Sequence, residues 1–172
     1  QYTVSYSKWR NTPNWASYNL EATHRGLLDR CDCFTYDPAL PADYPRYTTA
    51  DYTGASALQG LDRGHLVRSS DRTDGSLDNA RTFYFSNIVP QASENNQGPW
   101  AAFETYLGNQ ATNSNKEIFI VTGVAGNIGT VKNEGKIVIP ANMWKVAVIL
   151  PRDEGLSNVT SLTSAEIIAV IM

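Results

Sequence analysis

The chain has 172 residues, of which 42% are hydrophobic, 10% aromatic and 18% charged. This length and apolar content suffice for one domain with its own core over residues 1–172, and they exclude a disordered protein. The formal net charge of -3 excludes a strongly basic surface, which disfavours a passive nucleic-acid binder, whereas an enzyme needs positive charge only at its cleft.

Two strands are predicted at the start of the chain. Gln1–Ser7 alternates aromatic or apolar residues with polar ones, and Trp15–Leu20 follows a turn at 12–14, and both patterns are typical of β-strands. Residues 31–60 then contain many Pro, Asp, Tyr and Thr residues with no sustained period. Because long loops inside compact domains are often functional, we interpret this stretch as an ordered loop that leads to a site.

The long loop carries both cysteines, Cys31 and Cys33, on either side of Asp32. A C-x-C pair supplies too few ligands for a structural zinc site, and it is close for a disulfide, although a tight one can form in an oxidising compartment. No apolar run in the sequence reaches the roughly 18 residues of a membrane span, so no membrane partner is expected. The many Asn, Thr and Tyr residues and the few lysines are typical of secreted bacterial enzymes, so we expect a secreted or periplasmic protein.

Asp62-Arg63-Gly64-His65 places a carboxylate, a guanidinium and an imidazole within four residues. A guanidinium can hold phosphate oxygens bidentately while a nearby imidazole takes a proton near neutral pH, which suits phosphoester chemistry. The glycine allows a tight turn, a positive φ or the close approach of a substrate. On these four residues alone, a surface ion pair between Asp62 and Arg63 beside a structural His65 remains the alternative.

Loops and regular elements alternate after this motif. Residues 68–78 are polar and rich in turn formers, which predicts a hairpin connection or surface loop. Thr82–Val89 is aromatic and β-branched, which predicts a buried strand with Asn87 near its end. The polar stretch 91–98 predicts a connection. Pro99–Leu107 places large apolar residues on one face after an initial proline, which predicts a helix.

Further regular elements are predicted in the last third of the chain. Glu117–Thr122, Lys136–Ile139 and Met143–Leu150 are apolar and rich in β-branched residues, as strands are. Thr163–Glu166 has the spacing of a capping box, which predicts a helix running on to Met172. Together the elements predict a mixed α+β fold with a central antiparallel β-sheet.

Three blocks of residues carry a resemblance to a known family. In chain order they are Asp62–Leu66, Phe85–Gln91 and Asn95–Glu104. Their order and spacing closely resemble the DNA/RNA non-specific endonucleases of the ββα-metal (His-Me finger) class, which include the endonuclease G relatives. A single D-R-G-H motif is a weak signal, but three blocks in register are a specific one. The resemblance implies a ββα-metal unit at about residues 60–108.

The resemblance implies a role for each matched side chain. His65 would be the general base that activates a water for in-line attack on phosphorus. Asn96 would be the metal ligand, because a carboxamide oxygen suits a hard cation such as Mg²⁺, with Mn²⁺ or another divalent cation as a substitute. Glu104 would act through metal-bound water. If Asn96 and Glu104 lay on one helix, eight residues would separate them by about 12 Å, too far for both to bind the metal directly. Asp62 would brace the loop. On propensity alone, Asn96 is also a good turn or N-cap residue.

Arg63 would offset charge on the phosphate in the transition state. Asn87 would orient active-site groups or the phosphate, unless it makes only an edge-strand hydrogen bond. The sequence departs from the family at Gly108, where many relatives carry an arginine one turn after the helix glutamate, and an upstream arginine of the family has no unique match. Three arginines are candidates to supply this charge: Arg25, Arg30 and Arg68.

The function that the resemblance implies is endonucleolytic, sugar-non-specific hydrolysis of DNA and RNA, dependent on Mg²⁺ and leaving 5′-phosphate ends. The nucleic acid would be bound mainly through its phosphate backbone, because no module for reading base edges is recognisable. Activity should fall as acid protonates His65. Two alternatives stay open: a non-catalytic nucleic-acid or partner-binding module with a decayed site, and a Ser-His-Asp hydrolase, although the sequence has no G-x-S-x-G elbow.

Overall fold

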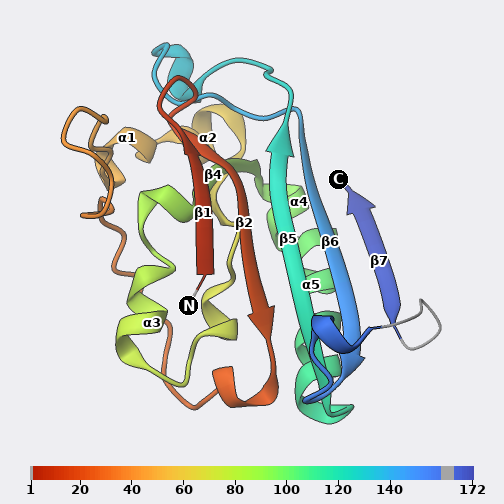
Figure 1. Ribbon diagram of the computed structural model, residues 1–172. Helices are drawn as coiled ribbons and strands as arrows, with labels where there is room; N and C mark the ends of the chain where they lie inside the picture. The colour runs from red at the N-terminus through yellow and green to blue at the C-terminus, as the bar shows by residue number, and fades with distance from the viewer. Residues whose placement is uncertain (1, 160–164) are drawn as a thin grey trace.

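The computed structural model describes residues 2–159 and 165–172. Its main feature is a five-stranded sheet in the order β1-β2-β5-β6-β7 (Figure 1). The strands are β1 (Tyr2–Ser7), β2 (Thr12–Leu20), β5 (Lys116–Ala125), β6 (Asn142–Pro151) and β7 (Glu166–Ile171). Every pairing in this sheet is antiparallel. The predicted α+β fold with a central antiparallel sheet is therefore confirmed.

One face of this sheet packs on α5 (Pro99–Asn113), the long helix that runs behind β5 and β6 in Figure 1. Alternate residues of β2, β5 and β6 point toward the helix and form a core with Trp100 and Leu107, as the two-residue period of strands requires. Proline begins the helix at a position where its missing N–H costs nothing. The predicted helix is confirmed and continues beyond Leu107.

A second, two-stranded sheet carries the Asp62-Arg63-Gly64-His65 motif. It consists of β3 (Leu61–His65) and β4 (Ile88–Ala92), paired antiparallel with His65 opposite Ile88. The chain passes directly from β4 into α4 (Ser93–Gln97) and then into α5. Two strands followed by a helix are the ββα unit expected over about residues 60–108.

Three short helices, α1 (Thr49–Tyr52), α2 (Ala55–Gln59) and α3 (Ser76–Arg81), complete the helical part of the fold. Short 3-10 segments lie at 22–24, 69–71, 85–87, 131–133 and 156–158. A second core forms where α1, α2 and β4 meet residues 131–139. Within the described residues, no helix combines the length and the apolar character that a membrane crossing requires.

The predicted C-terminal helix is wrong. Glu166–Ile171 is the edge strand β7, paired with β6. Its run of Ile and Val residues loses side-chain freedom in a helix and packs well on a pleated sheet, so the β-propensity outweighs the capping-box spacing. Thr163, the expected cap, lies outside the described residues.

Three other predictions need correction. Thr82–Val89 is a strand only from Ile88 onward, because the chain turns and forms a 3-10 segment before it. Lys136–Ile139 makes only an isolated β-bridge through Val138. Residues 68–78 are no surface loop: Ser69, Asp71 and Arg72 are buried. Arg72 is bonded to the carbonyls of Asp71 and Asn19, and Asp71 lies near the charged groups of Glu104 and Arg68.

Candidate active site

A cleft of about 430 Å³ lies between the ββα unit and the long loop. Residues on both sides of it include Arg30, Asp32, Phe34, Asp62, Arg63 and Asn96. The cleft thus brings together the motif arginine and the expected metal ligand. It also contains one of the three candidate arginines, Arg30, which the sequence had not distinguished from the other two.

Asp62 ties β3 to α4. Its carboxylate accepts hydrogen bonds from Ser93 Oγ at 2.7 Å, Asn96 Nδ2 at 2.8 Å and Gln97 Nε2 at 2.8 Å. Partial burial raises the pKa of Asp62, but the hydrogen bonds from Asn96, Gln97 and Ser93 outweigh it and lower the pKa overall. The carboxylate is therefore ionised and fixes the α4 side chains. Because Asn96 donates its amide nitrogen to Asp62, its oxygen is left for another partner.

His65 ends β3 as a buried side chain, 9% exposed. Its ring meets Phe34 at 5.7 Å and Phe83 at 4.9 Å, both edge to face. Its Nε2 atom is buried and has no hydrogen-bond partner among the described residues. Burial, with the positive charge of Arg30, lowers the pKa of His65 to about 3. The imidazole is therefore neutral far below pH 6.5, and the expectation of titration near neutral pH is wrong for this arrangement.

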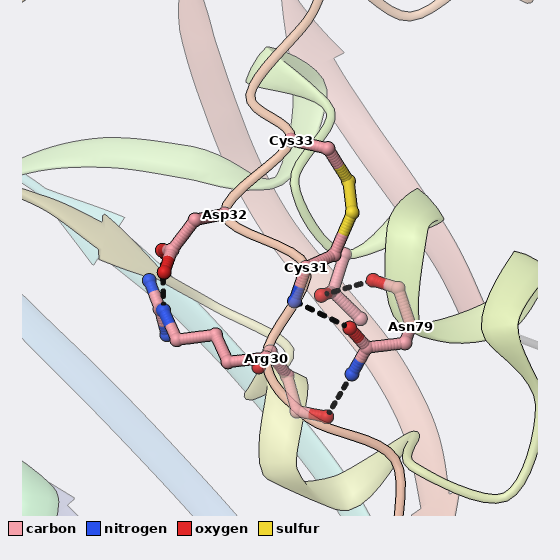
Figure 2. Close-up of a disulfide and its surroundings, with 7 residues drawn as sticks. Arg30, Cys31, Asp32, Cys33 and Asn79 are labelled. Carbon is pink, nitrogen blue, oxygen red and sulfur yellow. Dashed lines mark hydrogen bonds and ion pairs between the residues drawn. A yellow bond between two sulfur atoms is a disulfide. The ribbon is translucent and has the colours of Figure 1, made fainter.

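The loop wall of the cleft contains a disulfide. Cys31 and Cys33 are bonded, with their Cα atoms 5.1 Å apart. The backbone N–H of Cys31 donates to Asn79 Oδ1 of α3 at 3.2 Å, and Arg30 Nε donates to Asp32 Oδ1 at 2.6 Å (Figure 2). The pairing that the sequence left open is thus formed, and it fixes the loop segment that presents Arg30 to the cleft.

Phe34 was not found by sequence reasoning, although it contacts two of the predicted site residues. The Arg63 guanidinium lies 4.0 Å from the centre of the Phe34 ring, a cation–π contact, and the edge of the same ring meets His65. Arg30 in turn lies 4.8 Å from the centre of the Phe83 ring. No local signal distinguishes Phe34 in an aperiodic loop, because its neighbours come from β3.

Asn87 is fully buried and directed at the backbone. Its Oδ1 accepts from the Val67 N–H at 2.9 Å, and its Nδ2 donates to the carbonyls of Val67 at 2.9 Å and Thr82 at 2.8 Å. The carbonyl of Asn87 also accepts from the Leu66 N–H. With its side chain bonded in this way, Asn87 holds the segment that follows His65. This geometry fits the orienting role that was expected and does not fit a phosphate contact.

Glu104 is a buried residue of α5 and belongs to what we call the buried charge cluster: Glu104, Lys145, Arg68, Asp71 and Arg25. Lys145 Nζ donates to Glu104 Oε1 at 2.8 Å, and Arg68 Nε lies 3.7 Å from Oε2. Lys145 is fully buried and lies over the Trp100 ring at 4.4 Å. Burial, and after it the charge of Glu104, raises the pKa of Asp71 to about 6. The structure therefore places Glu104 away from the cleft lining, in a network that sequence reasoning missed.

Arg25 fills the space beside Gly108. A Cβ atom added to Gly108 would collide with Arg25 Nη1 and would lie 2.8 Å from its Cζ. Arg25 Nη1 and Arg68 Nη1 are both buried and lack a hydrogen-bond partner within the described part of the chain. The Arg25 guanidinium thus occupies the space that a side chain at 108 would take, and glycine at 108 makes room for it.

Gly64 and Gln91 form a second matched pair. A Cβ atom on Gly64 would lie 2.7 Å from Gln91 Cβ, and Gln91 is buried with neither amide atom hydrogen-bonded among the described residues. Gly64 belongs to the extended strand β3 and not to a turn. The glycine of the motif therefore admits Gln91 and does not serve the tight turn that the sequence suggested.

The donor set of the cleft fits a hard cation that keeps most of its water. Among the described residues, no three His, Cys, Asp or Glu side chains gather as metal ligands would. The Asn96 Oδ1 oxygen, left unused by the hydrogen bond from Nδ2 to Asp62, is the protein ligand available. One neutral oxygen suits a divalent cation completed by water and substrate oxygens, and it does not suit a soft or caged metal.

Comparison with known proteins agrees with these features. The sequence pattern of the DNA/RNA non-specific endonuclease family matches residues 1–168. A nuclease of Nostoc sp. is 37% identical over 95% of this chain and 58% of its own length, and human mitochondrial endonuclease G is 37% identical over 71% and 40%. A crystal structure of the EndoG/EndoGI complex superposes with a TM-score of 0.76 at 20% identity, over 99% of this chain and 70% of that chain. This chain spans about half the length of the curated relatives it matches.

Proposed function

The chain belongs to the DNA/RNA non-specific endonuclease family, and from this premise we propose that it hydrolyses internal phosphodiester bonds of DNA and RNA with Mg²⁺, leaving 5′-phosphate ends. One observation carries the proposal. The neutral His65, whose Nε2 has no partner among the described residues, packs against Phe34, a wall residue of the cleft that presents Arg63, Arg30 and the Asn96 carboxamide. A base, phosphate-binding cations and a hard oxygen ligand are what phosphodiester hydrolysis requires.

His65 is the proposed general base. Its Nε2 accepts a proton from the water that attacks phosphorus, the bond from phosphorus to the 3′ oxygen breaks, and that oxygen leaves with a proton from solvent. The lowered pKa keeps the imidazole unprotonated at neutral pH, as a proton acceptor must be. The Phe34 ring lies against the imidazole, so a movement of this side chain admits the water.

Arg63 and Arg30 are the proposed phosphate ligands. Both line the cleft, and one guanidinium group can donate hydrogen bonds to two oxygens of a phosphate at once. Arg63 rests on Phe34, and Arg30 rests on Phe83 while bonded to Asp32, contacts that hold both guanidinium groups in place at the cleft. Their charge offsets the negative charge that builds on the phosphate as the reaction proceeds.

Asn96 is the proposed metal ligand, through its Oδ1 atom, and Mn²⁺ or another divalent cation can substitute for Mg²⁺. The hydrogen bond to Asp62 fixes its amide plane. When bound, the cation supplies electrostatic stabilisation of the phosphate charge.

Asn87 and Glu104 are proposed as positioning residues. Asn87 fixes the backbone after His65, and Glu104 holds Arg68 and Lys145 beneath α5. We place both in the catalytic unit of a single domain over residues 1–172.

The proposal also covers the range of substrates and the location of the protein. The cleft presents charge for the phosphate backbone that DNA and RNA share, so binding should be largely independent of sequence and sensitive to salt. The Cys31–Cys33 disulfide supports a secreted or periplasmic location, because disulfides persist in oxidising compartments.

Supercoiled plasmid and a folded RNA, each incubated with the protein in Mg²⁺ and in excess chelator, test this function. We expect both substrates to be cut only with the cation, and ligation of the fragments without prior phosphorylation should show 5′-phosphate ends. Cleavage that persists in chelator would contradict the metal site. Binding without any cleavage would indicate a decayed site, and a single recognition sequence would contradict backbone recognition.

A further inference from the structure

A second cavity, of about 490 Å³, is larger than the catalytic cleft and lies between β1, α3 and the loop at 37–40. Its volume falls in the usual range of small-ligand sites, about 300–1,000 Å³. We call it the tyrosine cavity, after the side chains that dominate its lining. Prominent among these are Tyr2, Tyr6, Tyr84, Arg72, Arg81 and Asp37.

The tyrosine cavity shares a wall with the active site. Segments 34–37 and 83–86 form this wall and are joined by a parallel β-bridge. At the start of the two segments, Phe34 and Phe83 contact His65. Residues farther along the same segments line the cavity. At about 3.3 Å per residue of extended chain, residues 34 to 37 span about 10 Å.

The free hydrogen-bonding groups of the cavity are mainly donors. Arg72 is 2% exposed, and its Nη atoms are held by the carbonyls of Asp71 and Asn19. Its Nε atom is buried and finds no partner in the described part of the chain. Arg81 contacts Asp78 only at 3.4 Å, a weak geometry that leaves its guanidinium available.

One acid of the cavity, Asp37, is already engaged. Asp37 Oδ1 accepts from the Ala39 N–H at 2.8 Å, and its Oδ2 accepts from Ser86 Oγ at 2.5 Å. With Asp78, the lining holds two carboxylates against the two guanidinium groups. This balance disfavours a bare anion such as a phosphate. It favours a neutral group that carries acceptors for the arginines.

Aromatic walls add a second requirement. Tyrosine rings stack on flat heteroaromatic rings, and such stacking is tolerant of base identity. A nucleobase is neutral and flat and carries acceptor atoms on its edges. It reaches a concave site only when it is unstacked, as bases of single strands are.

We propose that the tyrosine cavity binds one unstacked nucleobase. The proposal rests on the proposed function for the source of that base, a single-stranded substrate whose phosphate lies in the cleft, and a free nucleoside presents the same chemistry. The cavity would then favour single strands over duplexes without selecting a sequence.

Calorimetric titration with adenosine, cytidine and ribose 5-phosphate tests the cavity without any cleavage. Arg81→Ala removes a donor from an exposed position, and Tyr84→Leu removes a ring. Lys136→Ala, which also removes one surface charge, is the control. We expect both nucleosides to bind the wild type and the control, and to bind each cavity variant roughly tenfold more weakly, the size of one lost stack or charged hydrogen bond. Ribose 5-phosphate should not bind.

Absence of nucleoside binding, or ribose 5-phosphate binding as tightly as adenosine, would overturn the proposal, as would equal nucleoside affinity in all variants. The source of the base follows from cleavage assays. Tyr84→Leu should raise the KM for single-stranded DNA more than the KM for duplex DNA if the base belongs to the strand, and should leave both KM values unchanged if the ligand is a free nucleoside. A protein that cleaves nothing fails the proposed function alone, because the titrations remain valid.

Discussion

The buried pair of Glu104 and Lys145 offers a way to separate folding from catalysis. Lys145 is fully buried and bonded to Glu104 at 2.8 Å. Removing one partner of a buried pair costs about 3–5 kcal/mol. Lys145→Met should fall near the lower value, because Arg68 still lies 3.7 Å from the carboxylate. Glu104→Gln should fall near the upper value, because the amide oxygen can still accept from Lys145 Nζ but the buried ammonium loses its counter-charge.

The double variant Glu104→Gln/Lys145→Met replaces both charged groups, and its free energy of unfolding should lie within about 1 kcal/mol of the wild-type value. Urea unfolding measures the four free energies, and plasmid cleavage is assayed on the same samples at a temperature where all are folded. We expect the double variant to regain stability but not activity. Single variants that each cost under about 1 kcal/mol would refute the buried pair, and wild-type cleavage by the double variant would refute a role for Glu104 in the reaction.

Three further predictions follow from the site. The log of kcat/KM of the wild type should stay flat on acidification until the pH approaches the His65 pKa of about 3. Phe34→Ala exposes the imidazole to water, so its activity should begin to fall at a higher pH, toward 6.5. A wild-type activity that already falls at pH 6.5 would contradict the burial of His65. Because the folded pKa of His65 lies below its unfolded value, its contribution to stability is complete above about pH 6.5 and is lost as the pH falls toward 3. Gly108→Arg should lose stability and activity, because the new side chain collides with Arg25, and Arg25→Gly should lose activity. The double variant Arg25→Gly/Gly108→Arg should recover stability and activity, because it moves the guanidinium from position 25 to position 108. A double variant no better than the worse single variant would exclude this exchange of positions. Asn96→Ala should weaken Mg²⁺ binding roughly tenfold in calorimetry with an uncleavable oligonucleotide, since one oxygen ligand is lost, and unchanged affinity would place the metal elsewhere.

The sequence predicted the parts of the fold whose signals are long and periodic. β5, β6 and α5 repeat their apolar residues over many positions, and tertiary packing agrees with that pattern. The short C-terminal segment carried two conflicting signals, a capping-box spacing and β-branched residues, and pairing with β6 decided for a strand. Thr82–Val89 has strand composition throughout, yet its first half turns because the Thr82 carbonyl is needed by Asn87.

For the site, the motifs identified residues but not their surroundings. Arg63 and Asn96 meet in one cleft as the resemblance implied, whereas Phe34 comes to His65 from a loop with no periodicity. Lys145 sits in an apolar strand where a lysine is ordinarily expected to reach solvent, and only its contact with Glu104 explains its burial. Contacts between residues distant in the chain are set by topology, and a single sequence contains no local trace of them.

The most direct test of the account is the single-turnover rate of plasmid nicking by His65→Ala in saturating Mg²⁺, beside a urea unfolding curve of the same preparation. Loss of a general base should lower the rate by about 10²–10⁴-fold, while the folded fraction and the substrate affinity stay near those of the wild type, because the base acts in the transition state and not in binding. A rate within a few-fold of the wild type, in a protein that remains folded, would contradict the assignment of His65 and with it the proposed mechanism.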